Sequence, residues 1–152
     1  MIIENSFIPF RGFLCVNLFG VIFTRDKKRI TWQVLNHELI HTMQLFEVDC
    51  YFSIPWIFLS SSISWWYLLG IPFSYYIWYL IEWIFRIFRA LATVYRVRQG
   101  KRKEHMKKAY YELLFEQEAR NHQDEILYIR NRQPFAWLND KLQGFLEKYL
   151  RI

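Results

Sequence analysis

The feature that most constrains this fold is a block of 32 residues, positions 50–81, without a charged side chain. Gly70, Ile71 and Pro72 interrupt it, and such residues typically break a helix. We therefore expect two apolar helices, over residues 51–69 and 73–88, of which the first is about long enough to cross a bilayer. A chain of 152 residues has little other surface with which to cover this block. The expectation is a hydrophobic hairpin over residues 50–92 that spans a membrane, and the alternative is a hairpin buried in a soluble core.

Positive charge flanks the apolar block on both sides. A basic turn at residues 25–29 precedes it, and residues 86–108 carry nine Lys and Arg side chains against Glu104 alone. The positive-inside rule then places both termini on the cytoplasmic side of the inner (cytoplasmic) membrane. Membrane lipid is an expected partner. No nucleic acid is expected, because stacking aromatics are not interleaved with the basic residues.

A metal-binding motif precedes the apolar block. The string Asn36-His37-Glu38-Leu39-Ile40-His41-Thr42 contains H-E-x-x-H, which random order would produce about 0.007 times in this composition. On a helix, His37 and His41 share one face and present two imidazoles to a single cation, with Glu38 beside them. Apolar residues at helical spacing, with Thr31 as N-cap, predict a metal helix over residues 31–48. The alternative is an ordinary helix whose histidines face solvent.

A catalytic zinc ion usually takes three protein ligands and leaves the fourth position to water, so one more ligand is needed. Periodicity predicts a second metal helix over residues 109–131. Glu116 is favoured because Ala119, one turn further on, lets two backbones approach closely, and Glu118 is the fallback. Either residue lies beyond the apolar block from His41, so a hairpin must return the chain to the same face. The wider candidate set is Asp49, His105, Glu112, Glu116, Glu118, His122 and Asp124.

The strings H-E-L-I-H and F-E-Q-E-A together resemble the two metal helices of gluzincin-type zinc metallopeptidases. The layout is similar to the Ste24/HtpX-like membrane peptidases and the ImmA/IrrE-like proteases, and the string T-W-Q-V-L-N-H-E-L-I-H-T-M-Q resembles small membrane proteins of Bacteroidetes type. The resemblance covers about a third of the chain and implies that His37, His41 and Glu116 bind Zn²⁺. It departs from the family pattern at Arg120, where an acidic or amide residue often follows the alanine.

The resemblance implies hydrolysis of a peptide or protein substrate. Glu38 would act as the general base toward water activated by zinc, and the oxyanion would need a further donor, for which His122, Tyr110 and Tyr111 are candidates. Two other classes remain open. One is a non-catalytic membrane protein with a structural zinc site, and the other is a membrane-surface adaptor without metal.

The remaining segments complete a mainly α fold in one membrane-associated domain, residues 1–152. Residues 7–24 predict two short strands, a β-hairpin within residues 1–30, whose edge could pair with an extended peptide. Residues 93–152 hold the basic segment, the second metal helix and, after Pro134, a C-terminal amphipathic helix. Glu82 and Arg86 predict an interfacial ion pair. Cys15 and Cys50 form no disulfide framework, which favours a reduced compartment.

Overall fold

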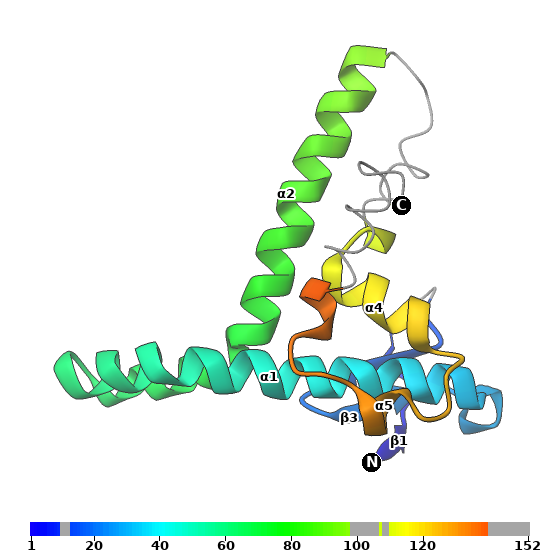
Figure 1. The fold of residues 1–152 in the computed structure, drawn as a ribbon, viewed down its shortest axis with the longest axis horizontal. Helices are drawn as coiled ribbons and strands as arrows, with labels where there is room; N and C mark the ends of the chain where they lie inside the picture. Colours follow the sequence, from blue (N-terminus) through cyan, green and yellow to red (C-terminus); the bar gives the residue numbers. More distant parts are fainter. Residues whose placement is uncertain (10–12, 98–106, 108–109, 140–152) are drawn as a thin grey trace.

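The computed structural model describes residues 1–9, 13–97, 107 and 110–139. The chain is mainly helical with short N-terminal strands, as predicted. Figure 1 shows the long helix α1 with the sheet and the short helices against its first half, and α2 rising steeply from it. The elements are β1 (Ile2–Glu4), β2 (Cys15–Leu18), β3 (Val21–Thr24), the 3-10 helix η1 (Lys27–Arg29), α1 (Trp32–Ser62), the 3-10 helix η2 (Trp65–Phe73), α2 (Ser74–Val97), α4 (Leu114–His122) and α5 (Tyr128–Asn131).

The N-terminal sheet has three strands, in the order β1-β3-β2. β2 and β3 form the predicted antiparallel hairpin, and its two-residue turn places Phe19 and Gly20 at φ 53° and 78°, as the right-handed twist of a hairpin favours. The prediction of two strands was incomplete, because β1 pairs in parallel with β3. A strand of three residues is too short to show a period in sequence.

α1 begins as predicted and ends much later. The Thr31 hydroxyl accepts a hydrogen bond from the backbone N–H of Val34, which caps the helix. The predicted end at Val48 is wrong, since α1 continues through Pro55 to Ser62. No glycine or proline lies between Val48 and Pro55, so nothing local breaks the helix there. The metal helix and the first arm of the hydrophobic hairpin are therefore one continuous element.

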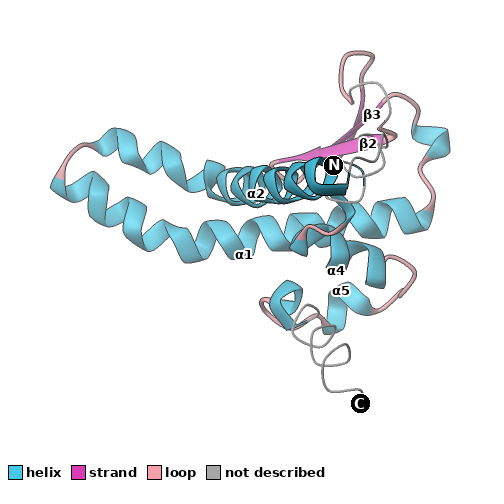
Figure 2. Cartoon of the chain, turned by 90° about the horizontal axis from the view of Figure 1, so that it is seen from above, coloured by secondary structure: helices cyan, strands magenta, loops and turns pink. Residues whose placement is uncertain are grey.

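The hairpin turns at Ile63 and Ser64, so the predicted helix over residues 51–69 and the turn at Gly70 to Pro72 are wrong. η2 returns along α1, as Figure 2 shows from above. Gly70 allows this close packing, because a Cβ there would lie 2.6 Å from ring carbons of Trp56. The Trp56 indole N–H also donates to Ser74 Oγ at 2.7 Å. The glycine therefore marks a helix contact rather than a helix break.

One described helical segment, Trp65–Arg89, is long and apolar enough to cross a membrane by length and composition, with a mean hydropathy of 1.3. It joins η2 to most of α2. Only 11% of its most apolar window is buried, and large apolar side chains such as Trp65, Ile81 and Phe85 are exposed. The structure therefore contains one candidate span within the predicted hydrophobic hairpin.

The short helix α4 packs across α1 and is capped at both ends by side chains from the long helices. Glu82 of α2 accepts from the backbone N–H of Leu114, at 3.2 and 3.3 Å, and also forms the predicted ion pair with Arg86, at 2.6 Å. Asn36 of α1 donates to the backbone carbonyl oxygens of His122, Gln123 and Glu125. These contacts satisfy groups that a helix end leaves unpaired.

The predicted single helix over residues 109–131 is therefore wrong, because α4 ends at His122 and α5 follows after a turn. α4 contributes Leu114 and Phe115 to a core that also contains Leu45, Val48, Tyr75 and Trp137. Most of the predicted C-terminal amphipathic helix, and much of the basic segment before α4, lie outside the described residues.

Replacing Gly70 by alanine tests the packing of η2 on α1. Gly70→Ala should cost about 1–3 kcal/mol of stability, because the new Cβ overlaps the Trp56 ring. The measurement is thermal unfolding of detergent-purified protein. In a Trp56→Leu background the same alanine should cost less stability, because the indole ring that it would overlap is absent. Equal costs in both backgrounds would contradict the overlap.

Candidate metal centre

The structure brings His37, His41 and Glu116 together, with one potential ligand atom of each within 4.8 Å of the others. The Nε2 atoms of the two histidines are 3.1 Å apart. Glu116 Oε1 lies 3.4 Å from His41 Nε2, and Oε2 lies 3.8 Å from His37 Nε2. Two nitrogens at the usual distance from a tetrahedral zinc ion would be about 3.3 Å apart. This group could therefore hold a metal ion with little rearrangement.

The Glu116 carboxylate is oriented by tyrosines and leaves one oxygen available. Its Oε1 accepts hydrogen bonds from Tyr110, at 2.5 Å, and Tyr79, at 3.1 Å. Its Oε2 is buried and has no hydrogen-bond partner among the described residues. Burying a carboxylate oxygen without such a donor is costly unless a cation lies beside it, and Arg120 Nε lies 3.5 Å away. Two imidazoles and one such carboxylate are a donor set that suits zinc.

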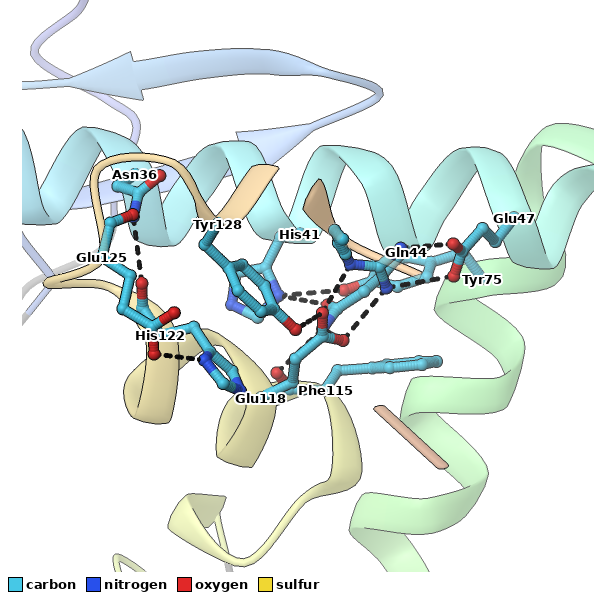
Figure 3. Close-up of polar contacts among 11 residues, drawn as sticks. Asn36, His41, Gln44, Glu47, Tyr75, Phe115, Glu118, His122, Glu125 and Tyr128 are labelled. Atoms are coloured by element: carbon cyan, nitrogen blue, oxygen red, sulfur yellow. Dashed lines mark hydrogen bonds and ion pairs between the residues drawn. The ribbon is translucent and has the colours of Figure 1, made fainter. Parts of the chain in front are cut away.

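Gln44, one turn after His41, sets the tautomer of that histidine. The Gln44 side-chain N–H₂ donates to the Phe115 carbonyl oxygen at 3.1 Å and to Glu118 Oε2 at 2.9 Å, so its Oε1 faces His41 Nδ1 at 2.7 Å. Because Gln44 Oε1 can only accept, Nδ1 carries the hydrogen and Nε2 faces Glu116. Figure 3 shows this chain of contacts between α1 and α4.

Glu118, the fallback ligand, lies outside the cluster of His37, His41 and Glu116. Its carboxylate is fully buried and accepts hydrogen bonds from Gln44, Tyr128 and Arg132. Arg132 also pairs with Glu47 of α1. Its guanidinium thus joins the segment after α5 to both α4 and α1. Glu118 therefore orients Gln44, which in turn bonds to His41, and does not face the cluster itself.

The close charges shift the pKa values of the cluster in opposite directions. Burial lowers the pKa of His37 to about 4, and the nearby His41 acts in the same direction. Burial also disfavours the charged form of His41, but its hydrogen bond to Glu116 and the Glu116 charge outweigh this and raise its pKa to about 9. Burial opposes ionisation of Glu116, yet contact with His41 and Tyr110 lowers its pKa to about 2. The ionised Glu116 thus draws a cation, either a proton or a metal ion, to His41 Nε2.

The cluster opens into a cavity of about 780 Å³. Its wall includes β2, the first turns of α1 and α2, and part of α4. Glu38 lines this cavity beside the cluster without belonging to it, and burial raises the pKa of its carboxyl group. The cluster and Glu38 therefore face the same cavity.

The three candidate oxyanion donors lie in different places. Tyr110 and Tyr111 line the cavity, although the Tyr110 hydroxyl already donates to Glu116. His122 is not part of the cavity lining. It bonds to Glu125, at 2.7 Å, and its ring stacks on Tyr128 with centroids 3.9 Å apart.

Arg120, the departure from the family pattern, lies on the cavity wall. Its Nε is 3.5 Å from Glu116 Oε2, and its guanidinium stacks on the Tyr111 ring at 3.9 Å. Arg120 thus approaches one oxygen of Glu116, while Tyr79 and Tyr110 hold the other oxygen and Gln44 holds His41. Of these, Gln44 had a detectable signal, because it follows His41 at helical spacing. Tyr79 had none, since only the folded hairpin brings it to Glu116.

Metal affinity should rise with pH between about 6 and 8. Metal and proton compete for His41 Nε2, so below its pKa of about 9 each unit of falling pH should weaken apparent affinity about tenfold. His37, with a pKa of about 4, adds nothing in this range. Competition with a chelating dye measures the slope, and His122→Ala should leave it unchanged. A flat profile from pH 6 to 8 would contradict the competition.

Gln44→Leu should weaken metal binding about 10–100-fold, the usual effect of losing a residue that orients a ligating histidine. Met43→Leu is the matched control. Met43 is the neighbour of Gln44 in sequence, is partly exposed and does not belong to the cluster, so it receives the same new side chain away from the site. Both variants are titrated with Zn²⁺. Equal affinities would show that Gln44 does not orient His41.

No protein-family model, curated protein or solved structure matches this chain. Its chemistry is therefore inferred from the geometry of its own site.

Proposed function

We propose that this chain is a membrane-associated zinc metallopeptidase. The observation that carries the proposal is the grouping of His37, His41 and Glu116 beside Glu38 on one open cavity. A purely structural zinc site usually has four protein ligands and is closed, whereas a catalytic site has three and keeps one position open. The described cluster offers three residues and adjoins a cavity, which favours the catalytic class.

When bound, a zinc ion supplies Lewis-acid chemistry, polarising a water molecule and a peptide carbonyl. Glu38 accepts a proton from the attacking water, whose oxygen forms a bond to the carbonyl carbon. The same carboxyl group then donates that proton to the leaving nitrogen as the C–N bond breaks. The raised pKa of Glu38 suits a group that must hold the proton between these two steps.

Strand β2 supports an extended peptide as substrate. It is an edge strand of the described sheet, and residues 15–18 all line the cavity. Unpaired backbone groups on such an edge can bind an extended chain by adding a strand. Tyr75, Tyr76 and Trp83 of the candidate membrane-spanning segment also line this cavity. The proposed location is therefore the membrane, with the site next to the span.

Glu38→Gln distinguishes a catalytic centre from a structural one. The variant should retain about one zinc per chain, while hydrolysis of a mixture of quenched peptides falls at least about a hundredfold, as expected for loss of a general base. Zinc content is measured by elemental analysis and hydrolysis by fluorescence. Equal hydrolysis by the variant, or none by zinc-loaded wild type, would contradict the peptidase assignment and favour a structural site.

Glu116→Ala and Glu118→Gln distinguish the two candidate third ligands. Glu116→Ala should lose stoichiometric zinc, because it removes the carboxylate facing both histidines. Glu118→Gln should retain zinc, because its carboxylate faces Gln44 and Arg132. Elemental analysis of the purified variants gives the answer. The reverse pattern would make Glu118 the ligand, and wild type without zinc after reconstitution would leave a membrane-surface interaction protein.

A further inference from the structure

Strand β2 contacts Glu38 at two points. The Cys15 thiol donates a hydrogen bond to Glu38 Oε1, with Sγ 3.1 Å from the oxygen. The Asn17 side-chain N–H₂ donates to the Glu38 backbone carbonyl oxygen at 2.6 Å. Cys15 and Asn17 are two residues apart in a strand, so their side chains leave the same face. One face of β2 therefore holds both the carboxylate and the backbone of the residue that we assign as general base.

The Asn17 contact has a defined orientation. Its Oδ1 accepts a hydrogen bond from the Gly20 backbone N–H at 3.0 Å, which directs the N–H₂ group toward α1. That group reaches both the Glu38 carbonyl and Thr42 Oγ1, the latter at 2.7 Å. The Thr42 hydroxyl donates in turn to the Glu38 carbonyl, at 3.1 Å. The β2–β3 turn and the Glu38 segment of α1 are thus joined by side-chain hydrogen bonds.

The Cys15 thiol engages one oxygen of the Glu38 carboxylate, Oε1. The thiol is 8% exposed, and burial, followed by the charge of Glu38, raises its pKa. Cys15 thus stays protonated at neutral pH and keeps its hydrogen for donation. It does not belong to the cluster of His37, His41 and Glu116.

We propose that Cys15 is a positioning residue whose thiol holds the Glu38 carboxylate in place, while Asn17 fixes the Glu38 backbone. This inference rests on the proposed peptidase function, because it explains how the base is aligned. A thiol suits the task because it is a weak donor, so it directs one carboxylate oxygen without binding it as tightly as a charged group would. The competing explanation is packing, in which Cys15 merely fills space behind β2.

Cys15→Ala and Cys15→Ser separate these explanations in a Cys50→Ser background. Cys15→Ala should lower kcat about tenfold with little change in KM, the pattern expected when a base loses a hydrogen bond that aligns it. Cys15→Ser keeps a donor and should restore most of kcat. Both variants should retain about one zinc per chain. Equal loss in the two variants would support packing, and full activity of Cys15→Ala would overturn the positioning role.

A second measurement does not depend on hydrolysis. In the Cys50→Ser protein Cys15 is the only thiol, so its S–H stretch can be read by infrared absorption. Glu38→Gln should shift the stretch to higher frequency, because a neutral amide accepts more weakly than a carboxylate. Met43→Leu, the matched control on the same helix, should leave it unchanged. An S–H band that Glu38→Gln does not shift overturns the inference, whatever the activity. A shifted band in a protein that hydrolyses no peptide overturns the peptidase assignment and leaves the Cys15–Glu38 contact established.

Discussion

The site depends above all on the docking of α4 across α1. α4 has nine residues, too few to form a stable helix in isolation. It is held because Glu82 satisfies its first backbone N–H and Asn36 bonds to the carbonyl oxygens of its last residue and of the residue after it. Those two side chains come from α2 and α1, so the short helix exists only where the long ones meet. Glu116 reaches the histidines because of this docking.

The docked surface is unusually polar for a protein interior. Gln44, Glu118 and Arg132 are all buried there, and burying such groups is costly unless each finds partners. The partners are present, since Gln44 bonds to His41 and Glu118, and Arg132 to Glu118 and Glu47. A shift of α4 by one turn would break these bonds together. The polar contacts therefore fix one register between the two helices, and with it the distance between the imidazoles and the Glu116 carboxylate.

Local signals in the sequence predicted the parts of the site that depend on spacing along one helix. His37 and His41, the Thr31 cap and the Glu82–Arg86 ion pair are all of this kind. Ala119 pointed to Glu116 because a small residue indicates close backbones. The length of α1 and the ends of α4 were missed because they are set from a distance. Gly70 illustrates the difficulty, since a glycine that permits contact with Trp56 looks the same in sequence as one that ends a helix.

The continuity of α1 has a mechanical consequence. Its 31 residues extend about 46 Å at the usual rise per residue, with His37 and His41 near one end and the apolar turn at the other. From His41 to Ser62 the distance is about 32 Å, so a tilt of about 10° at the apolar end would displace the histidines by about 5 Å. The helix thus acts as a lever arm. A change of angle at the apolar turn is therefore converted into a change in the position of His37 and His41 relative to that turn.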